Sequence, residues 1–302
     1  METYNEILRT APWFFPLFSA VLGACIGSFL NVCIYRIPKN ESIVSPGSHC
    51  GCGRPIQWRD NIPVLSWLIL RGRARCCGRP FSFRYPAVEL LTAALFLGCW
   101  LQFAPGKAVA GMVLCSIVIC ALFIDLDHMI IPDVFTIGGA AAGVLLSLLL
   151  PALHGQAHDF FLLASIRAGR ESVIGMFVGS ALVLWIALFA EAILKKEAMG
   201  FGDVKYLGAL GAFVGWKGAV FAMFGGAMLG CLWFIIGFAW QKTTGRTAPV
   251  ALPAETADGQ AVEPGLGVHV PFGPMLGVAA LLYFFGLSRW VDAYFDGLSV
   301  LF

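Results

Sequence analysis

The chain has 302 residues, of which 59% are hydrophobic and only 13% are charged. Soluble domains carry about 25% charged and about 45–50% apolar residues. A single soluble core cannot hide this much apolar surface, so the composition excludes an ordinary soluble domain and predicts a chain that faces lipid. The net charge of +2 says little about partners, and we expect the bilayer but no nucleic acid among them.

Eight apolar stretches are candidates for transmembrane helices, because crossing the hydrocarbon takes about 20 mostly apolar residues. The first is too long for the apolar part of a signal peptide and lacks a cleavage site, so we expect it to stay in the membrane. The sixth is short and rich in glycine, which suggests a tilted or half-buried helix. The fold class expected is an all-α polytopic membrane protein. In chain order the stretches are 12–35, 86–104, 107–124, 133–152, 172–194, 204–216, 218–239 and 271–293.

The stretch between the first two spans predicts the orientation. From Arg36 to Arg84 it contains nine of the chain's 20 basic residues and only two acids. Short loops with such an excess stay in the cytoplasm, although the same charges also suit anionic lipid. Counting spans then places 125–132, 195–203 and 240–270 in the cytoplasm and 153–171 outside. Glu89, at the entry to the second span, is expected to pair with an arginine of this loop.

Three parts of the chain follow from this pattern. Residues 1–35 hold the first transmembrane helix, and 36–85 form a basic cytoplasmic loop with four cysteines. Residues 86–302 form the transmembrane core. Its segment 240–270 is polar and rich in threonine, glycine and proline, which indicates a flexible surface loop.

Ionisable residues at membrane depth are costly and usually mark function. The stretch 123–133 contains three acids in a nine-residue run. Asp125 directly abuts the apolar run, so it is the acid most expected at the membrane boundary. Asp127 is better placed for solvation, and Asp133 after Pro132 suits the start of the next helix.

A second acid, Asp203, follows Gly200 and Gly202 just before the sixth apolar stretch. Glycine permits backbone angles that other residues avoid, and it would let an extended substrate approach closely. The alternative is an ordinary turn in which Asp203 caps a helix. Span counting puts Asp125 and Asp203 at the same face of the membrane.

Two adjacent carboxylates in a poorly solvated place share one proton, because both cannot ionise cheaply. One then acts as a base that activates water, and the other acts as an acid that protonates a carbonyl oxygen. The pair therefore predicts direct peptide hydrolysis that needs no cofactor. The sequence contains no Gly-x-Ser-x-Gly, His-Glu-x-x-His or Walker motif that would suggest another mechanism.

Six short motifs occur in one order and together resemble the type IV prepilin peptidases, also called leader peptidase / N-methyltransferases. The resemblance extends from about residue 23 to residue 276, and its specificity comes from the combination. The motifs are Gly27-Ser-Phe-Leu-Asn-Val-Cys-Ile-Tyr-Arg-Ile-Pro38, Asn61-Ile-Pro-Val-Leu-Ser-Trp67, Arg84-Tyr-Pro-Ala-Val-Glu-Leu90, Asp125-Leu-Asp-His128 with Pro132-Asp133, Gly200-Phe-Gly-Asp203 and Pro271-Phe-Gly-Pro274.

The resemblance implies a bacterial inner-membrane aspartic endopeptidase with its active site facing the cytoplasm. It would remove the leader of type IV prepilins or type II secretion pseudopilins by cleaving after a glycine. Asp125 and Asp203 correspond to the catalytic aspartates. Many members also methylate the new amino terminus with S-adenosylmethionine, which only the resemblance implies here, and no residue is assigned to that cofactor. Supporting positions in or near the motifs are Gly200, Gly202, Asp127, His128, Asp133 and Lys205.

The basic loop contains the pairs Cys50-Gly-Cys52 and Cys76-Cys77. The family pattern has two Cys-x-x-Cys pairs, which suit tetrahedral zinc, and both pairs are contracted here. Four thiolates can still converge on one structural zinc ion. Free thiols in a reducing cytoplasm and a disulfide are the alternatives.

Three other functions compete with the prepilin peptidase. An ion-coupled transporter would use the aspartates as a relay, but no inverted repeat is apparent and both acids lie at one face. A presenilin-like intramembrane protease would share the Gly-x-Gly-Asp chemistry but not the cysteine loop. A methyltransferase whose aspartates only orient substrate would not cleave without S-adenosylmethionine.

Overall fold

The computed structural model of the chain describes residues 6, 9–156, 160–195, 199–244 and 271–299. Within these ranges the protein is a bundle of helices, and strand-like pairing is limited to two isolated bridges. Six of the described helices are long and apolar enough to cross a membrane. The predicted all-α polytopic fold is therefore confirmed. The predicted flexible loop falls mostly on residues 245–270, outside the described residues.

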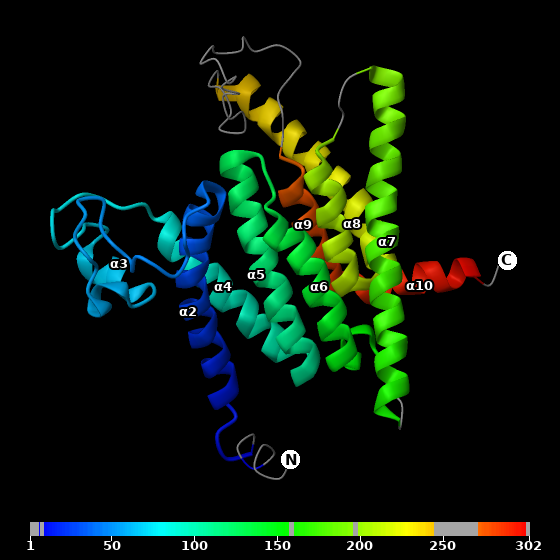
Figure 1. Ribbon diagram of the computed structural model, residues 1–302, viewed down its shortest axis with the longest axis horizontal. Helices are drawn as coiled ribbons and strands as arrows, with labels where there is room; N and C mark the ends of the chain where they lie inside the picture. The colour runs from blue at the N-terminus through cyan, green and yellow to red at the C-terminus, as the bar shows by residue number, and fades with distance from the viewer. Residues whose placement is uncertain (1–5, 7–8, 157–159, 196–198, 245–270, 300–302) are drawn as a thin grey trace.

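Most helices run roughly side by side in Figure 1, while a loop region with its short helix α3 lies beside α2. The α-helices are α2 (Phe14–Arg36), α3 (Leu65–Leu70), α4 (Arg84–Gln102), α5 (Pro105–His128), α6 (Asp133–Leu149), α7 (Phe161–Leu194), α8 (Phe201–Thr244), α9 (Gly273–Leu282) and α10 (Ser288–Ser299). The shorter elements are η1 (Ile37–Lys39), η2 (Trp58–Asn61), η3 (Pro151–His154) and the π-helical η4 (Tyr283–Leu287).

Helix α8 consists of two segments that meet at Gly215, where φ is 73° and ψ is 177°. A positive φ of this kind favours glycine, so the helix breaks there. The second segment runs antiparallel to α9, because Gly218 lies near Tyr283 while Gly226 lies near Leu276. A β-carbon on Gly211 of the first segment would lie 3.3 Å from Cβ of Ala219 in the second. The two segments therefore fold back on each other. They correspond to the predicted sixth and seventh spans.

The sixth predicted span lies at the centre of the bundle. Nearly every residue from 204 to 214 is buried in the structure. Its glycines and alanines look weakly apolar in sequence, yet they let neighbouring helices approach closely. The expectation of a half-buried helix was wrong, because small residues here reflect close helix contacts rather than contact with solvent, and the alternative of a tilted helix stays a prediction.

Two predicted boundaries differ from the structure. Helix α7 begins at Phe161 and not at residue 172, because charged residues such as Arg170 and Glu171 end an apolar run without ending a helix. The predicted last span, 271–293, divides into α9, η4 and α10. Helix α10 runs across the direction of α7 in Figure 1, and its Asp296 pairs with Lys217.

The cysteine loop and the aspartates are joined at one end of the bundle. Arg84, the first residue of α4, forms an ion pair with Asp127 near the end of α5, with an N–O distance of 2.7 Å. Glu89 accepts a hydrogen bond of 2.7 Å from the backbone N–H of Val64. The predicted partner of Glu89 was an arginine, so that prediction was wrong: a buried carboxylate is satisfied equally well by a backbone donor.

Candidate active site

Asp125 lies in the last turn of α5, and only 6% of its surface is exposed. The helix ends three residues later, where Met129 adopts a left-handed conformation. The backbone N–H of Gly273, at the start of α9, hydrogen-bonds the Asp125 carboxylate. The Asp125 carboxylate is therefore held at the end of the largely apolar helix α5, with the backbone N–H of Gly273 as its partner.

Asp203 lies in the first turn of α8 and is half-buried. Its backbone N–H donates to the carbonyl oxygen of Gly200 over 3.1 Å. A carboxylate at this position is favoured by the helix dipole. Asp203 lies close enough to Asp125 for the two charges to interact. The structure thus brings together two acids that are far apart in the sequence, at the carboxyl end of α5 and the amino end of α8.

Gly273 is packed directly against the carboxylate of Asp125. A β-carbon built on Gly273 would lie 2.7 Å from Oδ2 of Asp125 and 2.8 Å from Cδ1 of Ile131. Such contacts are too short for real atoms, so this position has room for hydrogen only. The Pro271–Pro274 motif, which sequence reasoning quoted without a role, therefore forms one wall of the aspartate site.

The flanking polar residues form cross-links between helices. Asp127 is held by Arg84, and Asp133 forms an ion pair with Lys205 of α8. Asp133 is the first residue of α6, directly after Pro132, which confirms the predicted helix start. His128 is exposed at the last position of α5. The predicted supporting residues Asp127, His128, Asp133 and Lys205 are all more exposed than Asp125.

The two glycines before Asp203 do not adopt the backbone angles that the sequence suggested. Gly200 and Gly202 are not among the described residues with a positive φ, so that part of the expectation was wrong. A β-carbon on Gly200 would be 4.0 Å from Oδ2 of Asp203, and one on Gly202 would be 3.8 Å from Cβ of Ile131. Because glycine has no side chain, these two positions leave open space next to the Asp203 carboxylate. Helix α8 itself begins at Phe201.

Tyr206, one helical turn after Asp203, was not singled out by sequence reasoning. Its side chain is fully buried, and the charges of Asp125 and Asp203 both act on its hydroxyl group. A tyrosine inside an apolar run resembles an ordinary core residue, so the only sequence signal was its spacing of three residues from Asp203.

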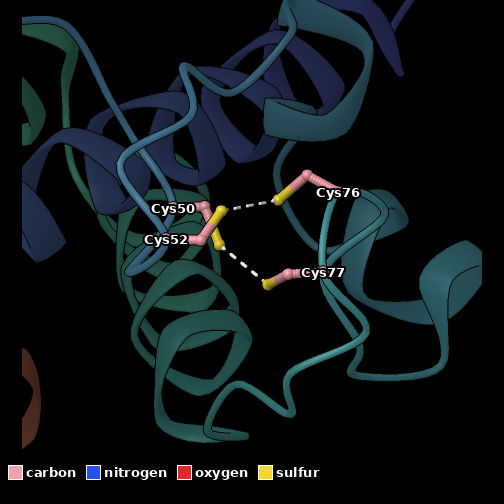
Figure 2. A group of neighbouring side chains, drawn as sticks. All are labelled: Cys50, Cys52, Cys76 and Cys77. Carbon is pink, nitrogen blue, oxygen red and sulfur yellow. Dashed lines mark hydrogen bonds between the residues drawn. The ribbon is translucent and has the colours of Figure 1, made fainter.

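The four loop cysteines converge, as Figure 2 shows. Their sulfur atoms all lie within 4.8 Å of one another. Two Sγ–Sγ contacts of 3.5 Å join Cys50 to Cys77 and Cys52 to Cys76. A tetrahedral Cys₄ zinc site has Zn–S distances of about 2.3 Å, so the four sulfur atoms need only small shifts to surround one ion.

Local turns explain how the contracted cysteine pairs reach one another. The backbone N–H of Cys50 donates to the backbone carbonyl oxygen of Arg54 over 2.8 Å. The backbone N–H of Gly78 donates to the backbone carbonyl oxygen of Ala74 over 2.8 Å. Each pair therefore sits in its own tight turn. A hydrogen bond from the backbone N–H of Cys52 is the main cause that lowers the pKa of the Cys50 thiol to about 7. The thiolate is the form that binds a metal.

Two cavities lie near these features. An apolar groove of about 520 Å³ lies between the second segment of α8 and the start of α9, with Phe272 and Met275 among its lining residues. A second cavity, of about 410 Å³, lies between α2 and the cysteine loop and includes Arg36 and Asn61. Phe272, which lines the first cavity, directly precedes Gly273 of the aspartate site.

A bundle of membrane-crossing helices that brings two carboxylates together at one end is the arrangement that a membrane aspartic peptidase requires. The family described as "Type IV leader peptidase family" matches residues 112–235, and the "Bacterial Peptidase A24 N-terminal domain" matches residues 21–103. The chain therefore belongs to the type IV leader peptidase family.

Curated relatives agree with this assignment. The chain is 33% identical to a "Prepilin leader peptidase/N-methyltransferase" of Aeromonas hydrophila, over 96% of this chain and 98% of the relative. Proteins with the same description from Myxococcus xanthus and Klebsiella pneumoniae are each 38% identical, over 78% and 70% of this chain and 67% and 90% of the relatives. No solved structure is significantly similar to the chain.

Proposed function

We propose that Asp125 and Asp203 are the two carboxylates with which this member of the leader peptidase family cuts prepilins. The observation that carries the proposal is their juxtaposition: two acids from separate apolar helices meet at one end of the bundle. Ionisable groups are rarely tolerated at such positions without a function. The other acids of the two motifs are held in ion pairs that link helices.

The chemistry needs one proton shared by the pair. The ionised carboxylate takes a proton from water, and the resulting hydroxide attacks the carbonyl carbon of the scissile bond. The protonated carboxyl group donates to the carbonyl oxygen. The tetrahedral intermediate then collapses, and the nitrogen of the leaving amine takes up a proton from the pair. Gly273 supports this arrangement, because its N–H holds the Asp125 carboxylate in place.

The substrates we propose are type IV prepilins or type II secretion pseudopilins, whose leaders would reach the site from the cytoplasmic side of the bacterial inner membrane. The apolar groove beside Phe272 suits an apolar segment that follows the cut bond. The basic loop lies at the same end of the bundle as the aspartates, which supports a cytoplasmic site under the positive-inside rule. Family membership speaks against an ion-coupled transporter.

We also propose that Cys50, Cys52, Cys76 and Cys77 bind one structural zinc ion. The distances among their sulfur atoms fit a closed four-cysteine site. When bound, the metal would close a loop that has little core of its own. Because the cysteines belong to this loop and not to the aspartate helices, the ion would stabilise the fold rather than take part in hydrolysis.

Methylation with S-adenosylmethionine is proposed from the names of the relatives. Neither of the two cavities described above is lined by a carboxylate that could pair with the amino group of that cofactor. The two cavities therefore do not fit it, and we derive no methyl-transfer step.

The function is tested by incubating the detergent-solubilised protein with a prepilin-like substrate, without S-adenosylmethionine, and following the products by mass. We expect a single cut after the leader glycine. If the folded protein leaves the substrate intact, the peptidase proposal fails. If cleavage requires S-adenosylmethionine, a methyltransferase whose aspartates orient the substrate explains the site better.

A further inference from the structure

The hydroxyl group of Tyr206 is buried beneath the carboxylate pair without a hydrogen-bond partner among the described residues. Its side chain has no exposed surface. Leaving a hydroxyl unsatisfied inside a protein costs about 1–3 kcal/mol, and phenylalanine would fill the same volume without that cost. An unpaired buried hydroxyl in a native chain therefore calls for an explanation.

The position of this hydroxyl is fixed by two glycines on one face of α9. A β-carbon on Gly273 would lie 2.7 Å from the carboxylate of Asp125, and a β-carbon on Gly277 would lie 2.7 Å from the hydroxyl oxygen of Tyr206. Residues four apart in a helix lie on the same face, separated by slightly more than one turn, or about 6 Å along the axis. The hydroxyl therefore lies about one turn deeper in the bundle than the carboxylate.

The other side of the site is formed by α8. Tyr206 follows Asp203 by three residues in α8, so the two side chains project from neighbouring turns of one helix face. The charges of Asp125 and Asp203 both act on the phenol, and Cys120 is the other titratable group that does so. No backbone carbonyl of α9 accepts a hydrogen bond from this hydroxyl among the described residues.

We propose that Tyr206 is a positioning residue for the carboxylate pair, and that its hydroxyl donates to the pair through one water molecule. Two hydrogen bonds of about 2.8 Å in series span about one helical turn, which is the offset derived above. A water-mediated hydrogen bond is nearly as strong as a direct one. The hydroxyl would fix the pair and its attacking water from the buried side, opposite to the side from which substrate enters. The inference rests on the proposed catalytic role of Asp125 and Asp203.

The test is Tyr206→Phe, which removes one oxygen atom and keeps the ring. Leader cleavage is measured over a range of substrate concentrations, together with the melting temperature of the purified protein. We expect kcat to fall about ten- to a hundredfold, because a hydrogen bond to a charged group has that effect on a rate. KM and the melting temperature should stay at the wild-type values.

Tyr283→Phe is the matched control, because Tyr283 is also buried in the bundle and its hydroxyl donates to Asp292 over 2.8 Å, away from the aspartates. This variant should keep the wild-type kcat. If Tyr206→Phe cleaves as fast as wild type, or if its melting temperature falls together with kcat, the hydroxyl has no positioning role. That result leaves the peptidase proposal intact as long as the wild-type protein cleaves its substrate.

Discussion

At the scale of single residues, the site depends on what touches the Asp125 carboxylate. One neighbour is the backbone N–H of Gly273, and another is the charge of Asp203. The environment is apolar and nearly closed, which strengthens each electrostatic contact and makes each unpaired polar group costly. Small changes to the residues that touch the Asp125 carboxylate should therefore affect the reaction more than the overall fold.

Gly273→Ala tests the contact between Gly273 and the Asp125 carboxylate. The added β-carbon would meet Oδ2 of Asp125 at 2.7 Å, so the carboxylate must move away from its backbone donor. Misplacement of a reacting group by about 1 Å can cost about a hundredfold in rate, and we expect a loss of that order in kcat. Gly286→Ala, in η4, is the control, because no atom lies within 4 Å of its β-carbon. Equal rates for both variants would contradict the role given to Gly273.

The sequence predicted the two acids because charged residues at the ends of apolar runs are conspicuous. It did not predict Tyr206 or the contact between Gly273 and Asp125. Both depend on how α8 and α9 pack in three dimensions, and an aromatic residue or a glycine inside an apolar run carries no local signal for such a contact. The supporting residues were recognised by their positions in motifs, and the structure then showed ion pairs for Asp127, Asp133 and Lys205.

At the scale of elements, close contact between α2 and α4 depends on small residues. β-Carbons on Gly23 and Gly27 would lie 2.7 Å from the Cα atoms of Ala93 and Glu89. Two backbones at this separation gain van der Waals contact in a membrane, where the hydrophobic effect cannot hold helices together. Gly23 and Gly27 are four residues apart, which is the spacing typical of small residues at such contacts.

Gly27→Ala should therefore push α2 and α4 apart. We expect a destabilisation of about 1–3 kcal/mol, as is usual when a packed interface is overfilled, measured as a lower melting temperature in detergent. Gly138→Ala provides the comparison, because that helical glycine is exposed and its β-carbon would meet no atom closer than 4.0 Å. Alanine there should be neutral or stabilising by about 0.5–1 kcal/mol. A drop of the same size at both positions would refute the packing argument.

The cysteine loop is the element whose geometry was hardest to predict from its contracted spacing. Two separate turns bring the pairs together, and left-handed glycines at 53 and 78 close them. The spacing of the cysteines in sequence was therefore a poorer guide than the turn residues around them.

Metal analysis of the purified protein should find about one zinc ion per chain, and none after Cys50 and Cys77 are both changed to serine. Chelation should make the loop more sensitive to protease. It should reduce peptidase activity less than Asp203→Ala does, because the metal site and the aspartates lie on different elements. Equal losses from chelation and from Asp203→Ala would show that the metal site takes part in the reaction.

At the scale of the whole molecule, the eight predicted spans correspond to fewer long helices among the described residues. Six helices are long enough to cross the membrane, α6 is shorter, and α8 contributes two segments. The boundary errors at α7 and α10 share one cause: hydropathy reports where a helix meets lipid, whereas helix ends depend on caps, breaks and tertiary contacts. The end of the bundle at which the acids meet was predictable, because span counting is robust to such errors.

The orientation of the bundle can be tested with a thiol reagent that does not cross membranes. A cysteine introduced at Ala152, an exposed residue of η3, should react in cells whose outer membrane is permeabilised. The native loop cysteines should react only in inverted vesicles after chelation. The opposite pattern would place the aspartates on the outer side and contradict a cytoplasmic leader as substrate.

The central claim is that Asp125 and Asp203 perform the hydrolysis, and the most direct test is the rate of leader cleavage in Asp125→Asn and Asp203→Asn. Both changes keep the shape of the side chain and remove the charge. Asp127→Asn, two residues from Asp125 and held by Arg84, is the matched control. The account predicts a loss of at least about a thousandfold in each of the first two variants and cleavage within about threefold of wild type in the third. Folded Asn variants that cleave like wild type would contradict it.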